Sequence, residues 1–176
     1  GVATATRELV DQIAGTSASL VDTRKTVPGL RALQKAAVQA GGGQNHRMGL
    51  YDAVLIKDNH IAVAGSTEAA VQQARAAVGP GTTIEIEVES TEQLESAIAA
   101  GADIVMLDNM SVDEMRAAVV LTDGRCRTEA SGGITIATIR EVAKTGVDMI
   151  SVGWITHSAP ALDVALDLEY LGPESI

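Results

Sequence analysis

The chain has few aromatic residues and a single cysteine, and both shortages exclude classes of protein. It contains no Phe, and its aromatic side chains are Trp154, Tyr51 and Tyr170. Proteins that stack nucleic-acid bases need more aromatic surface than this, so we expect no nucleic acid as partner. The lone Cys126 excludes an internal disulfide and a zinc site built from cysteines. It fits a reducing compartment, and we expect a cytoplasmic protein.

Long apolar runs and an excess of positive charge are also missing. No stretch approaches the roughly 18 apolar residues of a transmembrane helix. The first residues lack the features of a secretion signal, so no membrane partner is expected. The net charge of −10 argues against binding a polyanionic backbone. Residues 24–57 nevertheless carry six Lys or Arg and one Asp, which is consistent with attraction of a small anion. Within this segment, Arg31 and Lys35 are expected on a solvated helix face.

Short runs rich in Val, Ile and Leu alternate with Ala-rich segments of helical period. Buried strands are predicted at residues 19–24, 53–57, 83–89, 103–108, 127–131 and 149–153. Helices are predicted near residues 4–14, 30–39, 67–78, 91–100, 112–121, 135–145 and 161–168. The alternation predicts parallel strands with right-handed crossovers. We expect a single α/β domain over residues 1–176, an incomplete TIM-like α/β barrel of about six parallel strands with surrounding helices. A doubly wound open sheet is the alternative.

Serines and glycines mark the expected ends of the helices. Ser66, Ser90 and Ser111 stand where a hydroxyl would cap the first free amides of a helix. The last two also have the capping-box spacing to Gln93 and Glu114. Glycines after the helices predict left-handed C-caps at Gly41, Gly79, Gly101, Gly124 and Gly146.

Almost every predicted strand ends in charged or small polar residues, at positions 22–25, 57–60, 85–89, 108–109, 129–133 and 153–157. The carboxyl ends of parallel barrel strands converge on one mouth, so these side chains predict a common site. In the third strand, Glu85, Glu87 and Glu89 alternate with apolar residues and are predicted to point into the barrel. Buried carboxylates need partners. The candidates are Arg24, Lys25 and Lys57. The alternative is an edge strand with a solvated acidic face.

Two glycine-containing loops follow the last two predicted strands. Ser131-Gly132-Gly133 precedes the helix predicted from residue 135, and glycines there let a phosphate approach the backbone amides. Residues 153–158 form a second loop of this kind, at a position where barrels often hold phosphate. The pair His46-Arg47 lies in a glycine-flanked loop at residues 41–49. No cluster has zinc-ligand spacing, and no Ser-His-Asp triad is evident.

Six motifs together resemble quinolinate phosphoribosyltransferase, the decarboxylating enzyme of NAD biosynthesis. In order, they are residues 22–26 (DTRKT), 41–47 (GGGQNHR), 55–60 (LIKDNH), 107–109 (LDN), 129–133 (EASGG) and 152–158 (VGWITHS). The resemblance runs from residue 1 to about residue 168. It implies that quinolinate and phosphoribosyl pyrophosphate give nicotinate mononucleotide, carbon dioxide and pyrophosphate, with Mg²⁺ assisting.

The resemblance also implies roles for individual residues. The quinolinate carboxylates would be bound by Arg24, His46, Arg47 and Lys57. The phosphoribosyl donor would be bound by Lys25, Glu87, Asp108, Ser131, Gly132, Gly133, Gly153 and His157. The catalytic residues would be Lys25, Lys57, Glu87 and Asp108, and Mg²⁺ would be held by Glu87 and Asp108, directly or through water. The chemistry favours the same kinds of residue, apart from any resemblance. Dicarboxylates favour guanidinium and ammonium partners, and carboxylates stabilise an oxocarbenium-like C1′.

The sequence also departs from the family pattern. Family members carry an N-terminal domain ahead of this point, which the chain would lack, and they form a dimer in which a partner arginine enters the site. We therefore expect a homodimer or higher homo-oligomer for the complete enzyme. Trp154 stands where a smaller residue is commoner and is expected to crowd the 5′-phosphate.

Three other interpretations stay open from the sequence. The first is an isolated barrel that binds phosphate or quinolinate without turnover. The second is a related phosphoribosyltransferase-like protein of another pathway, and the third is an unrelated sugar-phosphate barrel enzyme. The combination of Arg24, Arg47 and Lys57 favours a dicarboxylate substrate, which counts against the second. The third would need the phosphate loops but not the His46-Arg47 loop.

Overall fold

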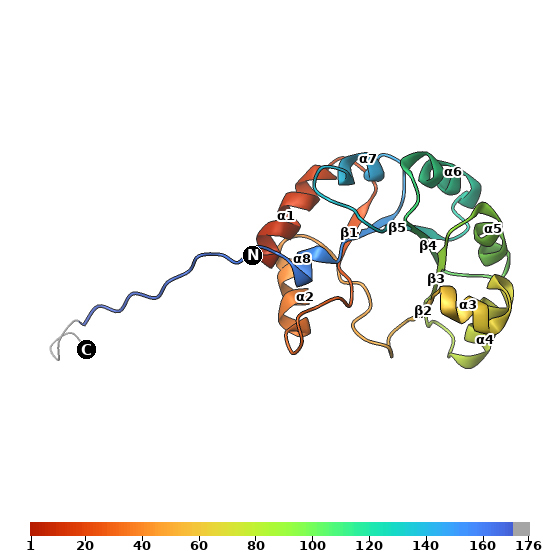
Figure 1. Cartoon of the computed structure of the whole chain (residues 1–176), viewed down its shortest axis with the longest axis horizontal. Helices are drawn as coiled ribbons and strands as arrows, with labels where there is room; N and C mark the ends of the chain where they lie inside the picture. The colour runs from red at the N-terminus through yellow and green to blue at the C-terminus, as the bar shows by residue number, and fades with distance from the viewer. Residues whose placement is uncertain (171–176) are drawn as a thin grey trace.

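A computed structural model describes residues 1–170 and shows an α/β fold built on one parallel sheet (Figure 1). The strands are β1 (Ser19–Val21), β2 (Val54–Ile56), β3 (Ile84–Val88), β4 (Ile104–Asp108), β5 (Arg127–Ser131) and β6 (Met149–Ser151). Their order is β1-β6-β5-β4-β3-β2, and every neighbouring pair is parallel. The strands therefore follow one another round the sheet, with β1 beside β6, as in a barrel opened between β1 and β2. The prediction of an incomplete barrel of six parallel strands is confirmed.

Helices cover the outside of the sheet. They are α1 (Val2–Gln12), α2 (Arg31–Ala40), α3 (Asp58–Ala64), α4 (Thr67–Ala77), α5 (Thr91–Ala99), α6 (Val112–Thr122), α7 (Ile139–Ala143) and α8 (Trp154–His157). Figure 1 shows α1, α7, α6, α5 and α4 in an arc around the strands. The hydroxyls of Ser66, Ser90 and Ser111 cap α4, α5 and α6 as predicted. The capping box is complete at Ser111, whereas Gln93 accepts the amide of Glu89 instead of that of Ser90.

The two faces of the sheet differ in polarity. Ile84, Ile86 and Val88 of β3 are fully buried in the main hydrophobic core, which lies between the sheet and the outer helices. Glu85 and Glu87 occupy the opposite, inner face, as predicted, and Glu85 is buried. Glu89 is exposed beyond the end of β3, so the prediction that it points inward was wrong. The apolar core thus stands outside the strands and leaves the inner face to polar residues.

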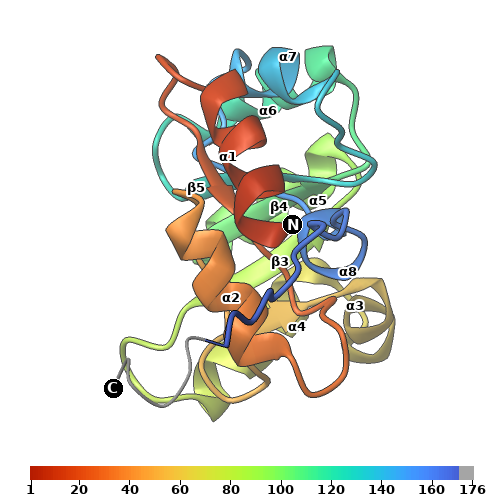
Figure 2. The ribbon, with the colours of Figure 1, turned by 90° about the vertical axis from the view of Figure 1, so that its left-hand side faces the viewer.

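A buried ion pair fixes the end of the sheet at β1, on the side where α1 and α2 lie (Figure 2). Lys35 of α2 is 1% exposed, and its Nζ binds Asp22, which is 0% exposed. The same carboxylate accepts the amide of His46 at 2.9 Å and the Asn45 side chain at 2.6 Å. The expectation that Lys35 lies on a solvated face was therefore wrong, because its charge ties β1 to residues 45–46.

Arg31 is not a freely solvated residue either. Its Nε donates to the Thr26 hydroxyl at 3.0 Å, and its guanidinium donates to the Arg24 carbonyl at 3.1 Å and the Met48 carbonyl at 3.2 Å. The side chain is half-buried. Arg31 thus fastens the loop after β1 to the loop before β2, which corrects its assignment to a solvated face.

Several helix predictions need correction. The short helices α3 and α8 were not predicted, and α7 begins at Ile139 rather than at residue 135. The segment 161–168, predicted as a helix, has no regular structure and is exposed, and it leaves the body of the molecule in Figure 1. Its large apolar side chains are 61–88% exposed, so within residues 1–170 no packed face holds the segment as a helix. These side chains are Leu162, Val164, Leu166 and Leu168.

Glycines end helices at only some of the predicted places. Gly101, Gly124 and Gly146 take positive φ angles, as predicted. Gly41 has a φ of −76°, because the left-handed residue is Gly42 with a φ of +93°. Gly79 is likewise outside the set of positive-φ glycines. None of the helices within residues 1–170 has the length and apolar character needed to cross a bilayer.

Candidate active site

A cavity of about 780 Å³ lies at the carboxyl ends of the strands. Every residue to which the sequence analysis assigned a binding or catalytic role lines it. They are Arg24, Lys25, His46, Arg47, Lys57, Glu87, Asp108, Ser131, Gly132, Gly133, Gly153 and His157. All six strand ends therefore contribute to one site, as the topology of a parallel barrel requires. The arrangement brings residues from positions 24 to 157 together.

Two elements supply a cluster of positive charge. Arg24 and Lys25 follow β1, where the Thr156 hydroxyl donates to the Lys25 carbonyl at 2.7 Å. Arg47 comes from the loop before β2, and its guanidinium donates to the Ala53 carbonyl at 3.2 Å. None of these three cations forms an ion pair with any residue from 1 to 170. The buried Nε of Arg24 also lacks a hydrogen-bond partner among the described residues.

The two guanidinium groups are in an unfavourable environment without an anion. Burial, and after it the positive charge of Arg24, lowers the pKa of Arg47, while the negative charges of Glu85, Asp52 and Glu87 oppose the shift. Like charges brought together and partly desolvated are stabilised when an anion lies between them. The cluster therefore has the charge that suits an anion.

Two carboxylates face these cations. Glu87 at the end of β3 pairs with Lys57, which follows β2. Asp108 at the end of β4 accepts a hydrogen bond of 2.9 Å from the Asn109 side chain. Each carboxylate has a second oxygen, and both line the cavity. Mg²⁺ in enzymes of phosphate esters is commonly bound by one or two carboxylates together with substrate phosphates and water, so this pair fits the ion.

The glycine loop after β5 has the backbone conformation that a close approach requires. Gly132 and Gly133 take φ angles of +99° and +60°. A Cβ on Gly132 would stand 2.2 Å from Oδ1 of Asn109, which itself has a φ of +56°. Only glycine fits at position 132. However, α7 starts six residues later and has five residues, so the expected helix start directly after the loop is absent.

The loop after β6 completes this side of the cavity. Trp154 lines it and donates its Nε1–H to the Ile134 carbonyl at 3.2 Å, which ties the two loops together. His157 is exposed, with its Nδ1 2.6 Å from the Ser158 hydroxyl. Trp154 therefore has a structural hydrogen bond, and the crowding of a phosphate by its ring stays a prediction.

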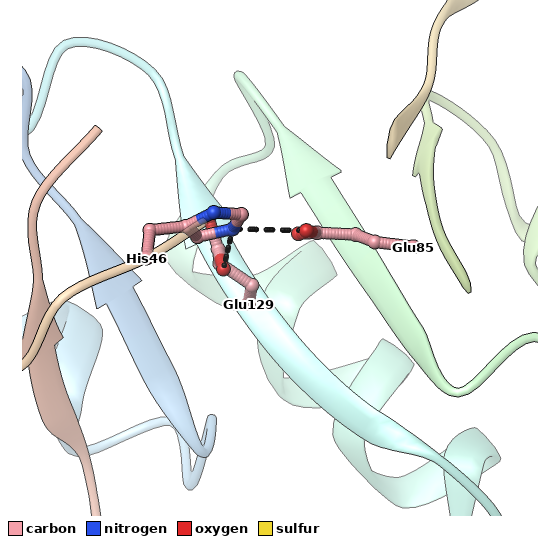
Figure 3. A group of neighbouring side chains, drawn as sticks. All are labelled: His46, Glu85 and Glu129. Atoms are coloured by element: carbon pink, nitrogen blue, oxygen red, sulfur yellow. Dashed lines mark ion pairs between the residues drawn. The ribbon is translucent and has the colours of Figure 1, made fainter. Parts of the chain in front are cut away.

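The interior of the barrel below the cavity contains a buried trio, His46, Glu85 and Glu129 (Figure 3). Nε2 of His46 lies 2.9 Å from Oε2 of Glu85 and 3.3 Å from Oε2 of Glu129. The prediction for Glu85 was wrong, because its partner is His46 and not Arg24, Lys25 or Lys57. Glu129 also received no role from the sequence. Its place on the inward-facing register of β5, two residues before Ser131, is the signal that points to it.

The trio holds a proton more tightly than its groups would in water. Burial opposes charge on His46, but hydrogen bonds and negative charge from Glu129 and Glu85 outweigh it and raise the pKa of His46 to about 10. Burial, assisted by Glu129 and opposed by His46, raises the pKa of Glu85 to about 7. The Arg47 amide donates to Nδ1 of His46 at 2.8 Å, so a second ring proton would face another hydrogen. We therefore place a ring proton on Nε2, where it faces Glu85 and Glu129.

The same geometry decides whether the trio fits a metal ion. Its donor atoms all lie within 4.8 Å of one another, a spacing that a cation could bridge. A histidine that binds a metal through Nε2 carries its proton on Nδ1 and donates it. Here Nδ1 accepts a hydrogen bond from the Arg47 amide. The trio is therefore arranged as a hydrogen-bonded cluster rather than as a metal centre.

Comparisons with known proteins agree on one family. The model of the family described as quinolinate phosphoribosyl transferase, C-terminal domain, matches residues 2–167. A probable nicotinate-nucleotide pyrophosphorylase [carboxylating] of Bacillus subtilis (strain 168) is 51% identical over the whole chain, which covers 61% of that protein. The nicotinate-nucleotide pyrophosphorylase [carboxylating] of Mycobacterium leprae (strain TN) is 48% identical over 96% of the chain, which covers 60% of that protein. The chain thus spans about three fifths of the length of these relatives.

Solved structures show the same relation. The nicotinate-nucleotide pyrophosphorylase from Francisella tularensis has a TM-score of 0.90 and 49% identity, over 93% of this chain and 58% of that one. The thiamine phosphate pyrophosphorylase from Pyrococcus furiosus has a TM-score of 0.51 at 21% identity, over 89% of this chain and 82% of that one. The second likeness extends to the fold alone.

Proposed function

The chain belongs to the family of quinolinate phosphoribosyl transferase C-terminal domains, and from that premise we propose that it forms the catalytic barrel of such an enzyme. The reaction joins the ring nitrogen of quinolinate to C1′ of phosphoribosyl pyrophosphate and releases pyrophosphate. The carboxylate at ring position 2 then leaves as carbon dioxide, and a proton takes its place. The products are nicotinate mononucleotide, pyrophosphate and carbon dioxide.

The cluster of Arg24, Lys25 and Arg47 is the observation that carries the proposal. Three cations without anionic partners among the described residues share one cavity with Lys57. A pyridine dicarboxylate supplies the two negative charges that the two guanidinium groups need, each able to bind a carboxylate through two hydrogen bonds. Held in this way, the ring nitrogen is fixed in place for attack, and positioning accounts for much of the rate.

Glu87 and Asp108 stand where positive charge develops. As pyrophosphate leaves, C1′ takes on oxocarbenium character, which nearby carboxylates stabilise. Mg²⁺, when bound by these two residues, would neutralise charge on the departing pyrophosphate. The ion pair of Glu87 with Lys57 links the carboxylate at C1′ to a cation of the quinolinate site. A substrate in either half of the cavity therefore contacts one partner of this pair.

The glycine loop at residues 131–133 supports binding of the donor's 5′-phosphate. Its positive φ angles turn the backbone toward the cavity, and no side chain stands between an anion and the amides of Gly132 and Gly133. Ser131, Gly153 and His157 line the same part of the cavity. The departure of carbon dioxide needs no protein nucleophile, because the positive charge on the adjacent ring nitrogen stabilises the electron pair left on ring carbon 2, and that pair then takes the proton.

Substitution of Arg47 tests the assignment. In the complete enzyme that contains this chain, Arg47→Ala is expected to abolish quinolinate binding while it leaves binding of phosphoribosyl pyrophosphate intact. Isothermal titration calorimetry with each substrate measures both. Arg116→Ala, in an exposed ion pair on α6, is the matched control and should change neither affinity. Unchanged quinolinate affinity in the Arg47 variant would refute the proposal.

Activity of the chain by itself needs a separate measurement. Release of labelled carbon dioxide from quinolinate, by this chain and by the complete enzyme, distinguishes a barrel that turns over from one that binds only. A homodimer and a cytoplasmic location stay predictions. Among the matched relatives, proteins of Nicotiana glauca and Arabidopsis thaliana are named mitochondrial and chloroplastic.

A further inference from the structure

His46 is fixed to the protein through all four of its polar groups. Its amide donates to Asp22 at 2.9 Å, and its carbonyl accepts from Lys35 at 3.0 Å. In the ring, Nδ1 accepts the Arg47 amide at 2.8 Å, and Nε2 faces Glu85 at 2.9 Å. The side chain is 13% exposed. The imidazole therefore has one orientation, and its firmest contact toward the cavity is with the main chain of Arg47.

Burial of the Glu85 and Glu129 carboxylates beneath the His46 ring costs free energy of folding. Glu85 is 1% exposed and Glu129 is 0% exposed. One oxygen of Glu85 and both oxygens of Glu129 lack a hydrogen bond of good geometry within the described part of the chain. Replacing buried charged groups by apolar ones of similar size is often neutral or stabilising, so stability alone does not explain this pair. A role in holding the His46 ring in one orientation explains why the two carboxylates are buried there.

The ring of His46 connects this pair to Arg47. Without an acceptor at Nε2 the ring is free to turn, and the Arg47 amide loses its acceptor at Nδ1. Arg47 sits in the loop before β2, and its guanidinium is held at one further point, the Ala53 carbonyl. A shift of its main chain would therefore move the guanidinium within the cavity. Misplacement by about 1 Å is enough to cost about 100-fold in rate.

We infer that Glu85 and Glu129 are positioning residues, which fix the ring of His46 and through it the main chain of Arg47, so that the guanidinium meets a substrate carboxylate. The inference rests on the proposed function, because it takes quinolinate as the anion bound by Arg47. It adds two residues that act through His46: Glu85, which lies outside the lining of the cavity, and Glu129, which is part of it. It also predicts that their effect passes through Arg47, and a double-mutant cycle detects this directly.

The cycle combines Glu85→Met with Arg47→Lys in the complete enzyme, because Lys keeps a cation and a measurable KM, whereas Arg47→Ala is expected to abolish quinolinate binding. Met has a volume close to that of Glu but no acceptor for Nε2, whereas Glu85→Gln keeps an oxygen that can accept. Glu85→Met is expected to raise the KM for quinolinate about 10- to 100-fold, and Glu85→Gln to stay within about threefold of wild type. The KM for phosphoribosyl pyrophosphate should stay within about twofold in both. Glu129→Met and Glu129→Gln should follow the same pattern, and the exposed Glu95→Met on α5 should change nothing.

In the Arg47→Lys background, Glu85→Met should raise the KM for quinolinate by less than about threefold more, because the guanidinium fork that depends on the fixed main chain is already gone. A full further loss in that background would overturn the inference, because Glu85 would then act independently of Arg47. An unchanged KM for quinolinate in the single variant, or an equal rise for both substrates, would overturn it too. Thermal midpoints of all variants show that each is folded. A wild-type enzyme without quinolinate turnover would instead refute the proposed function itself.

Discussion

The buried ion pair of Lys35 and Asp22 illustrates how strongly one buried charge affects the stability of the fold. Both side chains are almost fully buried, and Asp22 also binds the Asn45 side chain and the amide of His46. Lys35→Met would leave Asp22 buried without its cation. We expect the free energy of unfolding to fall by about 3–5 kcal/mol, measured by urea denaturation. Lys144→Met, in an exposed pair with Glu141, should cost less than about 1 kcal/mol, and equal losses would contradict the argument.

The buried trio predicts a pH dependence of stability. The pKa of Glu85 is about 7 in the folded protein, above the usual value of 4.5, chiefly because of burial. A raised pKa means that the folded state binds the proton more tightly. The stabilisation from Glu85 is therefore complete below pH 4.5 and is lost as the pH rises through 7. Glu85→Gln should remove this loss, so its stability relative to wild type should rise between pH 4.5 and 7 in urea titrations. A constant difference over that range would show that Glu85 does not titrate there.

At the level of single residues, the sequence identified the groups but not all of their partners. Lys57 was among the cations predicted to pair with the carboxylates of β3, and it pairs with Glu87. The pairing of Glu85 with His46 was not predicted, because His46 comes from a loop whose path no periodicity reveals. Lys35 was misassigned for a related reason. An Ala-rich helix has no strong apolar stripe to show which of its faces is buried.

The glycine loop after β5 gives a prediction at the scale of an element. Gly132→Ala would place a Cβ 2.2 Å from the Asn109 side chain, at a φ of +99° that Ala rarely adopts. We expect a stability loss of about 1–3 kcal/mol. The affinity for phosphoribosyl pyrophosphate should also fall, because the loop would shift from its place at the cavity. Thermal denaturation and calorimetry measure the two effects.

Gly79→Ala is the control for this prediction. Position 79 follows α4, has no positive φ and has nothing within 4 Å of a Cβ, so its effect should stay within about 0.5 kcal/mol. A Gly132→Ala variant with wild-type donor affinity would show that the loop does not contact the donor.

The strands and long helices could be predicted from the sequence, and the short or extended segments could not. All strands but the polar β5 are compact apolar runs, and Ser66, Ser90 and Ser111 carry a cap that is local in the chain. By contrast, α8 has four residues, fewer than two helical turns, so no period can identify it. The tail at residues 161–168 was assigned to a helix from its helical period, but it is exposed and without regular structure, because a period alone does not supply a surface to pack against.

At the scale of the whole molecule, topology alone predicted where the site lies. Parallel strands joined by helices bring all their carboxyl ends to one side, so charged strand ends had to meet there. The sheet order, with β1 beside β6 and ends at β1 and β2, depends on contacts between distant residues. The buried links from α2 and residues 44–47 that fasten β1 have no signal in local sequence. For this reason the cavity was predicted more completely than the trio below it.

The division between an apolar outer layer and an exposed tail gives a last prediction for the molecule as a whole. Leu9 on α1 is 0% exposed and belongs to the main core, whereas Leu166 in the tail is 84% exposed. Leu9→Ala should therefore cost about 2–5 kcal/mol, because it leaves a cavity between α1 and the sheet. Leu166→Ala removes the same atoms where they already contact water, and it should change the free energy of unfolding by less than about 0.5 kcal/mol. Chemical denaturation of both variants of this chain makes the comparison. A large loss for Leu166→Ala would mean that the tail packs against apolar surface in solution, and the exposed alternating leucines would then belong to an interface.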